Sequence, residues 1–288
     1  MMRLEQLERG SFAPASDALE GLDPIRIVSW NINRGLQLNE ILAFLTDASA
    51  DLILLQEVDV NARRTHRRNI AQEIAQTLQM NYVFGCEFEE LTQGNRNSPA
   101  YHGQATLSRL PLSTSRILRF HMQSGFWRPR WFVPKIQKSQ RRLGARMALI
   151  TQINWAERPL IVYNLHLESR GDNGLRRSQL TQVLEDARQY VSETPVVIAG
   201  DFNLDLSRQP ATSIISDARL DNPFNNGKVR PTTARSHWGH ARTIDWILTG
   251  GPLAFVGTEL HDSVSASDHY PMSLTLLPKI VSNPSFVR

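Results

Sequence analysis

The sequence has a single cysteine, Cys86, so a framework of internal disulfide bonds is excluded. A lone cysteine is typical of a reducing compartment, and we predict a cytoplasmic protein. The chain also lacks any apolar run close to the ~18 residues that a membrane-spanning helix needs. Its first 24 residues, MMRLEQLERGSFAPASDALEGLDP, contain no apolar segment of signal-peptide length. These absences favour a soluble globular protein.

Acidic residues are missing from one long segment. Between Glu90 and Glu157, 66 consecutive residues contain no aspartate or glutamate, and 11 of the 32 lysines and arginines lie there. The segment therefore carries a charge of +11, which leaves −7 for the rest of the chain. Within it, residues 126–146 read FWRPRWFVPKIQKSQRRLGAR, in which rings and cations interleave. This pattern favours an anionic partner, because cations pair with phosphates and rings stack on bases or enter a lipid interface. A solvated loop is the alternative.

Short apolar runs alternate along the chain with helical patterns. Runs rich in β-branched residues predict strands at residues 25–30, 51–56, 105–109, 147–153, 159–167, 195–200, 243–249 and 272–277. Apolar stripes of helical period predict helices over residues 37–48, 66–80 and 175–191. Residues 207–242 contain many breakers and predict long loops. We expect helices that cover sheets in one α+β domain over residues 25–280, with a flexible arm over 1–24 and a tail over 281–288.

Polar residues collect where the predicted strands begin or end. They are Asn31, Asn33, Glu57, Asp59, His166, Glu168, Asp201, Asn203, Asp245, Asp268 and His269. Strand ends are the usual place for a site on a rigid scaffold. Oxygen donors dominate this set and no cysteine belongs to it, which indicates a hard cation such as Mg²⁺ or Mn²⁺ rather than structural zinc.

Seven motifs carry a resemblance to a known family. They are WNIN (30–33), LLQEVD (54–59), HGQATLSRLPL (102–112), NLHLES (164–169), GDFN (200–203), TIDWIL (243–248) and SDHYP (267–271). In this order and spacing they resemble the endonuclease/exonuclease/phosphatase superfamily, which includes pancreatic deoxyribonuclease, abasic-site endonucleases, neutral sphingomyelinases and inositol polyphosphate 5-phosphatases. The resemblance spans residues 25–277. It implies a four-layer α/β/β/α sandwich of two mostly antiparallel sheets flanked by helices, with a divalent-metal site at the sheet edge.

The resemblance also implies roles for single residues. It makes Glu57 the principal metal ligand, with Asn31 and Asp268 completing or supporting the coordination. Asp201 resembles the residue that activates the attacking water, and Asn203 the one that holds water or phosphate in line.

Two histidines and an acid complete the implied catalytic set. His269 resembles the imidazole that contacts the phosphate, with Asp245 fixing its orientation. His166 matches the second histidine of the deoxyribonuclease and sphingomyelinase branches.

Further residues are candidates for binding substrate. Asn33 stands where the abasic-site branch has an aspartate, which puts a second anionic ligand there in doubt. His102 precedes the strand at residues 105–109, where relatives place phosphate-contacting residues. In the basic aromatic segment the candidates are Arg128, Arg130, Arg141 and Arg142.

Three functions remain open at this stage. The first is a metal-dependent phosphodiesterase acting on nucleic acid, as an endonuclease or exonuclease, with the acid-free segment as the surface that holds the strand. The second keeps the chemistry but acts on a phospholipid or inositol phosphate at an anionic membrane. The third is a binding module without turnover, which the intact set of catalytic positions disfavours. We expect a monomer without a protein partner.

Overall fold

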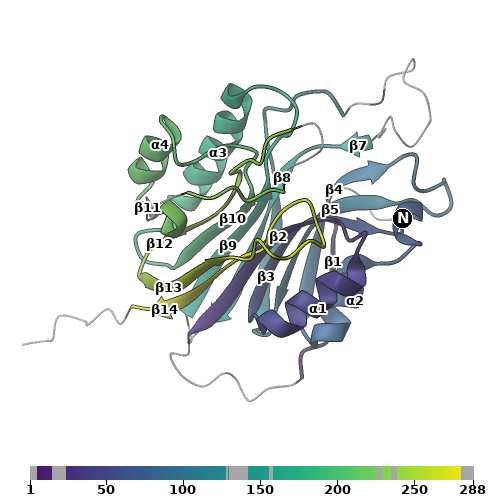
Figure 1. The fold of residues 1–288 in the computed structure, drawn as a ribbon, viewed down its shortest axis with the longest axis horizontal. Helices are drawn as coiled ribbons and strands as arrows, with labels where there is room; N and C mark the ends of the chain where they lie inside the picture. Colours follow the sequence, from purple (N-terminus) through teal and green to yellow (C-terminus); the bar gives the residue numbers. More distant parts are fainter. Residues whose placement is uncertain are drawn as a thin grey trace, which may run out of the picture.

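The computed structural model describes residues 5–14, 24–127, 129, 142–155, 158–225, 229–234 and 239–279. Two β-sheets pack face to face, and helices cover the outer face of each (Figure 1). The expected α+β sandwich of four layers is confirmed. Among the described residues, no helix is both long and apolar enough to cross a membrane.

The first sheet runs in the order β1, β4, β5, β3, β2, β14, β13, with β7 also paired to β4. Its strands are β1 (Leu7–Ser11), β2 (Ile25–Arg34), β3 (Leu52–Val60), β4 (Asn81–Glu90), β5 (Tyr101–Ser108), β7 (Arg142–Gly144), β13 (Leu253–Leu260) and β14 (Met272–Pro278). Only the pairing of β2 with β3 is parallel among its described ladders.

The second sheet runs in the order β11, β12, β10, β9, β8, β6. Its strands are β6 (Leu112–Arg119), β8 (Met147–Trp155), β9 (Arg158–His166), β10 (Val196–Asp201), β11 (Leu220–Asp221) and β12 (Asp245–Gly250). Here β9 and β10 are parallel and the other described pairs are antiparallel. Both sheets are therefore mixed and mostly antiparallel.

Helices α1 (Leu38–Ala48) and α2 (Ile70–Leu78) cover the first sheet, and α3 (Asn173–Ala187) and α4 (Ala211–Asp217) cover the second. Short 3₁₀ helices lie at Arg63–Thr65 and Pro223–Asn225. The Asn69 side chain begins α2 by accepting a hydrogen bond from the Gln72 N–H, and Asp172 begins α3 in the same way through Leu175. Each cap satisfies an N–H that has no partner inside the helix.

Each predicted strand and helix is present, but two expectations for the connecting segments are wrong. Residues 1–24 are not an arm throughout, because Leu7–Ser11 pairs with β4 along its whole length and so has its hydrogen bonds inside the sheet. Residues 207–242 are not only loops, because α4 and β11 lie within them. Strands β4, β6, β7 and β13 were not predicted. The sequences of β6, β7 and β13 mix polar and apolar residues at partly exposed positions, whereas β4 (NYVFGCEFEE) is almost wholly buried but interrupts its apolar residues with polar ones.

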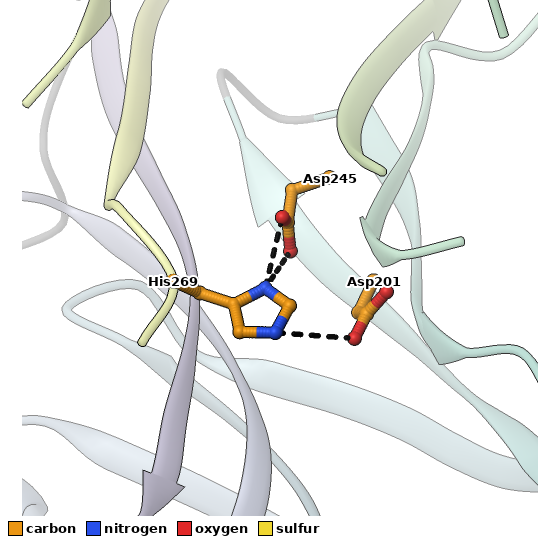
Figure 2. Close-up of side chains that lie close together, drawn as sticks. All are labelled: Asp201, Asp245 and His269. Carbon is orange, nitrogen blue, oxygen red and sulfur yellow. Dashed lines mark hydrogen bonds and ion pairs between the residues drawn. The ribbon is translucent and has the colours of Figure 1, made fainter. Parts of the chain in front are cut away.

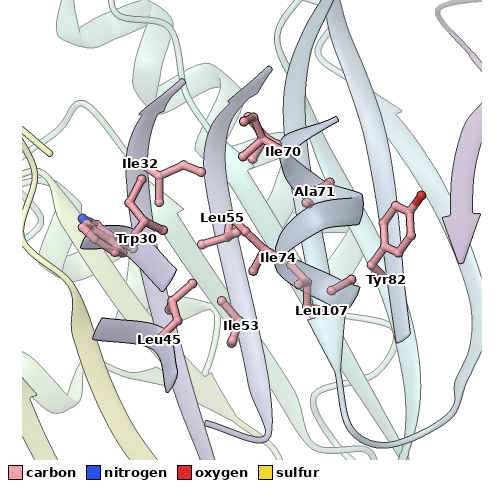
Figure 3. Close-up of a cluster of buried hydrophobic side chains, with 14 of the residues drawn as sticks. Trp30, Ile32, Leu45, Ile53, Leu55, Ile70, Ala71, Ile74, Tyr82 and Leu107 are labelled. Carbon is pink, nitrogen blue, oxygen red and sulfur yellow. The ribbon is translucent and has the colours of Figure 1, made fainter. Parts of the chain in front are cut away.

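Alternation along the strands divides the apolar core. In β2, Val28 and Trp30 face the helices α1 and α2, while Ile25 and Ile27 face the second sheet. Successive side chains of a strand point to opposite faces, so a sheet buried on both sides contributes to two cores. Figure 3 shows the outer core, where Leu45 of α1 and Ile74 of α2 pack on strands of the first sheet.

Candidate active site

The layer between the sheets changes from apolar to polar toward one end of the parallel strands. In β10 the inward positions read Val197, Ala199 and then Asp201; in β2 they read Ile25, Ile27, Ser29 and then Asn31. Strand β9 follows the same rule from Leu160 and Val162 to Asn164 and His166. Since these positions have the same parity, the polar side chains point into the space between the sheets.

Strand register places three of these residues side by side. Asp201 of β10 lies opposite His166 of β9 and opposite Asp245 of β12. From the other sheet, Asn31 Nδ2 donates to Asp201 Oδ2 at 3.2 Å. Residues far apart in the chain therefore meet because two sheets pack with their polar ends together.

Two β-bulges redirect further side chains at the same end. The pairing of β2 with β3 shifts between Asn31 and Arg34, and the pairing of β3 with β5 shifts between Leu55 and Val58. Asn33 and Glu57 lie in these shifts with φ of 43° and 53°, a conformation uncommon for non-glycine residues. A bulge changes where a side chain points. The direction of the Glu57 side chain therefore cannot be predicted from simple alternation along β3.

His269 stands between two aspartates (Figure 2). Its Nδ1 donates to the Asp245 carboxylate at 2.9 Å, and its Nε2 lies 3.8 Å from Asp201 Oδ2. All three residues are buried, and one candidate ligand atom from each lies within 4.8 Å of the others. The Asp201 Oδ2 atom is also 3.4 Å from His166 Nε2. Asp201 is thus the centre of a carboxylate–imidazole cluster.

The charges of this cluster follow from its burial and its neighbours. Burial alone lowers the pKa of His269, but Asp245 and Asp201 outweigh it and raise the pKa to about 10. Burial raises the pKa of Asp201 to about 7, with Asp245 acting in the same direction and His269 against it. Burial, together with Arg146, holds the pKa of His166 well below its usual value. At neutral pH the site contains an imidazolium at His269 and a neutral imidazole at His166.

Hydrogen bonds around the cluster fix its side chains. Thr232 Oγ1 donates to Asp245 Oδ2 at 2.6 Å, and the Trp30 indole donates to the His269 carbonyl at 2.8 Å. The Asn203 N–H donates to Asp201 Oδ1 at 2.8 Å, while its side chain donates to the Leu167 carbonyl. Preorganised groups of this kind are what a catalytic site needs. Trp30 begins the WNIN motif without a role that the sequence could assign, and Thr232 lies in residues 207–242, where the sequence predicts only loops.

The first prediction concerns Asp245 as the residue that orients His269. In Asp245→Asn the carboxylate that raises the pKa of His269 is lost, so this pKa should fall below about 10. Because folding raises this pKa above its ordinary 6.5, the imidazolium stabilises the fold below that pH, and the contribution disappears as the pH rises through about 10. Histidine NMR titration measures the change directly, and turnover should fall by about 10²-fold or more.

Asp221→Asn is the matched control, since Asp221 lies exposed on β11, the neighbour of β12. It should leave both the titration of His269 and the turnover unchanged. An Asp245→Asn variant in which His269 titrates as in the wild type would contradict the orienting role.

Glu57 remains charged at the edge of this cluster. Burial by itself raises its pKa, but nearby positive charge, above all that of Arg34, outweighs burial and holds the pKa well below the usual value. Arg34 Nη2 lies 3.6 Å from Glu57 Oε2, and the Glu57 side chain is 20% exposed. An ionised, partly accessible carboxylate suits a cation ligand.

The residues expected to bind metal have different settings. Asn31 is buried, and its Oδ1 accepts from the Asn33 N–H at 3.1 Å. Asp268 is exposed at the rim, where Ser267 Oγ donates to its carboxylate. Carboxylate and amide oxygens such as those of Glu57, Asn31 and Asp268 suit a hard cation. The buried group of Asp201, Asp245 and His269 could also hold a metal ion.

His102 belongs to a buried ionic network rather than to an open surface. Its Nδ1 donates to Asp59 Oδ1 at 2.9 Å, and Asp59 also accepts two hydrogen bonds from Arg64. Arg64 further donates to Glu90, whose pKa burial raises but Arg142 and Arg64 lower to about 2. Asp59 and Glu90 are fully buried. Arg64, in the basic run ARRTHRR (residues 62–68), is therefore a structural residue.

The second prediction tests this network. Arg64→Met leaves Asp59 and Glu90 without their shared partner, and removing one member of a buried ion pair costs about 3–5 kcal/mol of unfolding free energy. Urea denaturation measures this loss. Arg63→Met is the control, because Arg63 is exposed and should change stability by less than ~0.5 kcal/mol. Equal stability of the two variants would refute a structural role for Arg64.

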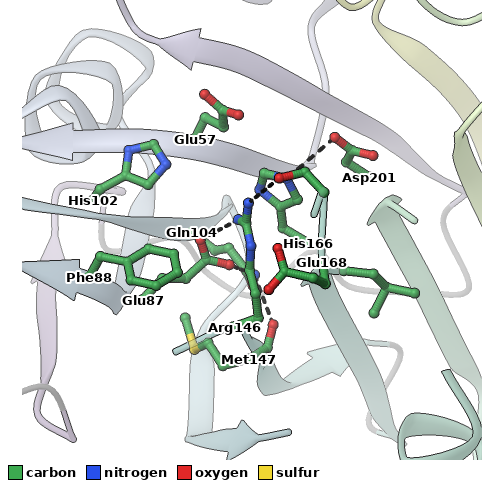
Figure 4. A network of polar contacts seen from close by, with 12 residues as sticks. Glu57, Glu87, Phe88, His102, Gln104, Arg146, Met147, His166, Glu168 and Asp201 are labelled. Carbon is green, nitrogen blue, oxygen red and sulfur yellow. Dashed lines mark hydrogen bonds and ion pairs between the residues drawn. The ribbon is translucent and has the colours of Figure 1, made fainter. Parts of the chain in front are cut away.

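Arg146 lies at the centre of a second polar network (Figure 4). Its Nη1 donates to Glu87 Oε2 at 2.9 Å, and its Nη2 donates to Ser169 Oγ at 3.3 Å. Gln104 donates to the same Glu87 carboxylate. The figure shows Arg146 between the strand that carries Gln104 and the segment that carries His166 and Glu168. These hydrogen bonds hold Arg146, Glu87 and Gln104 in place beside His166.

One predicted substrate contact needs correction. Arg142 is only 2% exposed, and its Nε donates to Glu90 Oε1 at 2.8 Å. Its guanidinium also lies 4.7 Å from the Trp127 ring. It is therefore not an exposed cation that holds a strand, because burial and pairing with Glu90 use its charge. Arg128, Arg130 and Arg141 lie outside the described residues.

Taken together, the fold and the carboxylate–imidazole cluster at the polar end of the two sheets define a hydrolase of the metal-dependent phosphoesterase class. The structure brings together Asn31, His166, Asp201, Asn203, Asp245 and His269. The profile of the Endonuclease/Exonuclease/phosphatase family matches residues 28–269, and the chain belongs to this family. No curated protein matches the sequence.

Solved structures share the fold at low identity. The human Nocturnin catalytic domain with bound sulfate anion is 18% identical, with a TM-score of 0.63 over 95% of this chain and 98% of that one. A humanized D. rerio TDP2 is 18% identical, with a TM-score of 0.61 over 88% and 98%. An endonuclease/exonuclease/phosphatase from Beutenbergia cavernae is 17% identical, with a TM-score of 0.63 over 89% and 72%.

Proposed function

We propose that this protein is a divalent-metal-dependent phosphodiesterase that acts on nucleic acid, with Mg²⁺ or Mn²⁺ as its cofactor. The observation that carries the proposal is the Asp245–His269–Asp201 cluster, in which an imidazolium stands beside a carboxyl group of pKa about 7. A carboxylate with a pKa near neutrality accepts a proton from water effectively at working pH. A fixed imidazolium stabilises negative charge on a phosphate.

Each residue has a role in this mechanism. Asp201 takes the proton of the attacking water, and Asn203 keeps the Asp201 carboxylate oriented through its N–H. His269 presents its positive charge to a phosphate oxygen and is oriented by Asp245. Glu57, with Asn31 and Asp268, would hold the metal. The metal, when bound, supplies a positive charge that polarises the phosphate.

A neighbour of the same fold binds a tetrahedral anion. The human Nocturnin catalytic domain was solved with a bound sulfate anion. Sulfate has the tetrahedral shape and oxygen charge of a phosphate group. A buried imidazolium at His269 suits such a tetrahedral anion.

A panel of substrates tests the proposal. Plasmid DNA, an abasic oligonucleotide, sphingomyelin and inositol phosphates would each be incubated with Mg²⁺, with Mn²⁺ and with EDTA. Metal-dependent cleavage of a nucleic acid is the expected result. Cleavage confined to sphingomyelin or inositol phosphates would show that the proposed substrate is wrong and that phosphoester hydrolysis is right. A lack of turnover on all four would favour a binding module.

A further inference from the structure

Phe126 and Arg170 form an exposed aromatic and cationic pair beside the site. The Phe126 side chain is among the exposed large apolar residues, at 54%. The Arg170 guanidinium lies 4.8 Å from the centroid of the Phe126 ring, and Arg170 is exposed. Trp127 supports Phe126 from a half-buried position, with ring centroids 4.8 Å apart and planes at 85°. We call Phe126, Trp127 and Arg170 the platform.

A buried carboxylate holds the platform in place. Glu168 is fully buried, and it accepts hydrogen bonds from Ser124 Oγ at 2.8 Å, Trp127 Nε1 at 2.9 Å and the Arg170 N–H at 2.9 Å. The Phe126 N–H donates in turn to Ser124 Oγ at 3.1 Å. A buried carboxylate is costly unless donors surround it. Here two donors belong to the platform residues Trp127 and Arg170, and the third is Ser124, which also binds the Phe126 N–H. Glu168 therefore joins two chain segments into one rigid surface.

The platform adjoins the catalytic cluster. Glu168 follows His166 by two residues, which corresponds to at most about 7 Å of extended backbone. The intervening Leu167 N–H donates to the Asp201 carbonyl at 2.9 Å, so the segment continues the pairing of β9 with β10. A group bound on Phe126 would therefore stand next to a phosphate held at Asp201 and His269.

We propose that the platform binds a nucleobase of the substrate, stacked on Phe126, while Arg170 pairs with a neighbouring phosphate. The inference rests on the proposed phosphodiesterase function and names what lies beside the scissile bond. An exposed ring with an adjacent arginine is the combination by which proteins hold single-stranded nucleic acid. The charge of Arg170 complements the phosphates of such a strand.

The setting of Trp127 argues against a membrane contact. An interfacial tryptophan keeps its indole N–H for the head-group region. Here the Trp127 N–H is used by buried Glu168, and the Arg142 guanidinium covers the ring at 4.7 Å. The exposed part of the platform is therefore one ring and one guanidinium, which matches one base and one phosphate.

Binding without metal tests the platform. The probes are fluorescein-labelled oligothymidylate and an oligomer of the same length built from abasic tetrahydrofuran units, both measured by anisotropy in EDTA. Phe126→Ala should weaken oligothymidylate binding by about 10-fold and leave the abasic oligomer unaffected. Arg170→Ser should weaken both. Met122→Ala is the control, because Met122 is 57% exposed in the same segment, and it should change neither.

The outcomes separate this inference from the proposed function. A wild type that prefers oligothymidylate but cleaves no substrate would contradict the phosphodiesterase and leave the platform standing. Equal wild-type affinity for the two oligomers, or binding of neither, would overturn the platform. If Phe126→Ala lost binding to phosphatidylserine vesicles and kept its oligothymidylate affinity, the surface would be a membrane contact and the inference would fail.

Discussion

Glu57→Gln should abolish turnover and leave the fold intact. The change removes one charge from a carboxylate whose pKa lies well below the usual value, and it preserves the shape of the side chain. A bound metal stabilises transition-state charge by several kcal/mol, so its loss reduces the rate on the order of 10³-fold or more. Because folding lowers the pKa of Glu57, its charge stabilises the fold at neutral pH, so Glu57→Gln should lower the unfolding free energy without preventing folding.

Metal binding can be followed apart from activity. A ligand that binds only the native state raises the unfolding temperature, so Mg²⁺ should stabilise the wild type and not Glu57→Gln. Glu40→Gln makes the same chemical change on the exposed face of α1 and should behave as the wild type. Wild-type activity of Glu57→Gln in saturating Mg²⁺ would contradict the metal assignment.

Asp201→Asn and His269→Ala should each reduce turnover by ~10²–10⁴-fold, the usual contribution of one positioned acid or base. Asparagine cannot take a proton from water, although it can still accept the Asn203 N–H. Alanine removes the imidazolium that faces Asp201 and Asp245. Steady-state rates on the substrate that the panel identifies provide the measurement, with Asp221→Asn as the control.

Although Asp201→Asn should lose turnover, its unfolding free energy should not fall. Folding raises the pKa of this carboxyl group from 3.8 to about 7, so keeping it ionised above that pH costs folding free energy. The amide removes this cost, and urea denaturation at pH 8 should show a variant at least as stable as the wild type. Loss of activity without loss of stability distinguishes a catalytic carboxylate from a structural one.

The two residues should act as one unit. Groups that function together show strongly non-additive losses, so Asp201→Asn combined with His269→Ala should lose far less than the product of the single effects. A double variant whose loss of turnover equals the product of the two single losses would indicate that Asp201 and His269 act separately. Either single variant with more than roughly a tenth of normal activity would disprove its proposed role, because a positioned base contributes at least ~10²-fold.

Local patterns were enough to predict the layers of this fold. Strands such as β2 and β10 could be predicted because their apolar, β-branched runs end abruptly in polar residues. The same parity rule would also have indicated Gln56 and Asn164, which hydrogen-bond between the sheets at 2.8 Å. Strand β1 escaped prediction, because LERGS has no apolar run and forms a strand only through pairing with β4.

Such local patterns could not predict contacts between residues far apart in the sequence. Arg64 reads as one of several surface arginines, yet its side chain joins Asp59 to Glu90. Arg142 reads as part of a basic surface, yet Glu90 and the Trp127 ring enclose it. In both cases the charge of an arginine says nothing about its partner, which depends on how the sheet edges pack.

By itself, the sequence determined which residue types stand at the ends of which strands, since alternation and motif order are local properties of the chain. Tertiary structure decided which of them meet. Asn31 reaches Asp201 across 170 residues only because two sheets pack with their polar ends aligned, and Glu57 points toward the site only because a bulge interrupts β3. Burial between these sheets then sets the charges, raising the pKa of Asp201 to about 7 and, through the two aspartates, that of His269 to about 10. Such shifts depend on desolvation and on distances between side chains, which exist only in the folded protein.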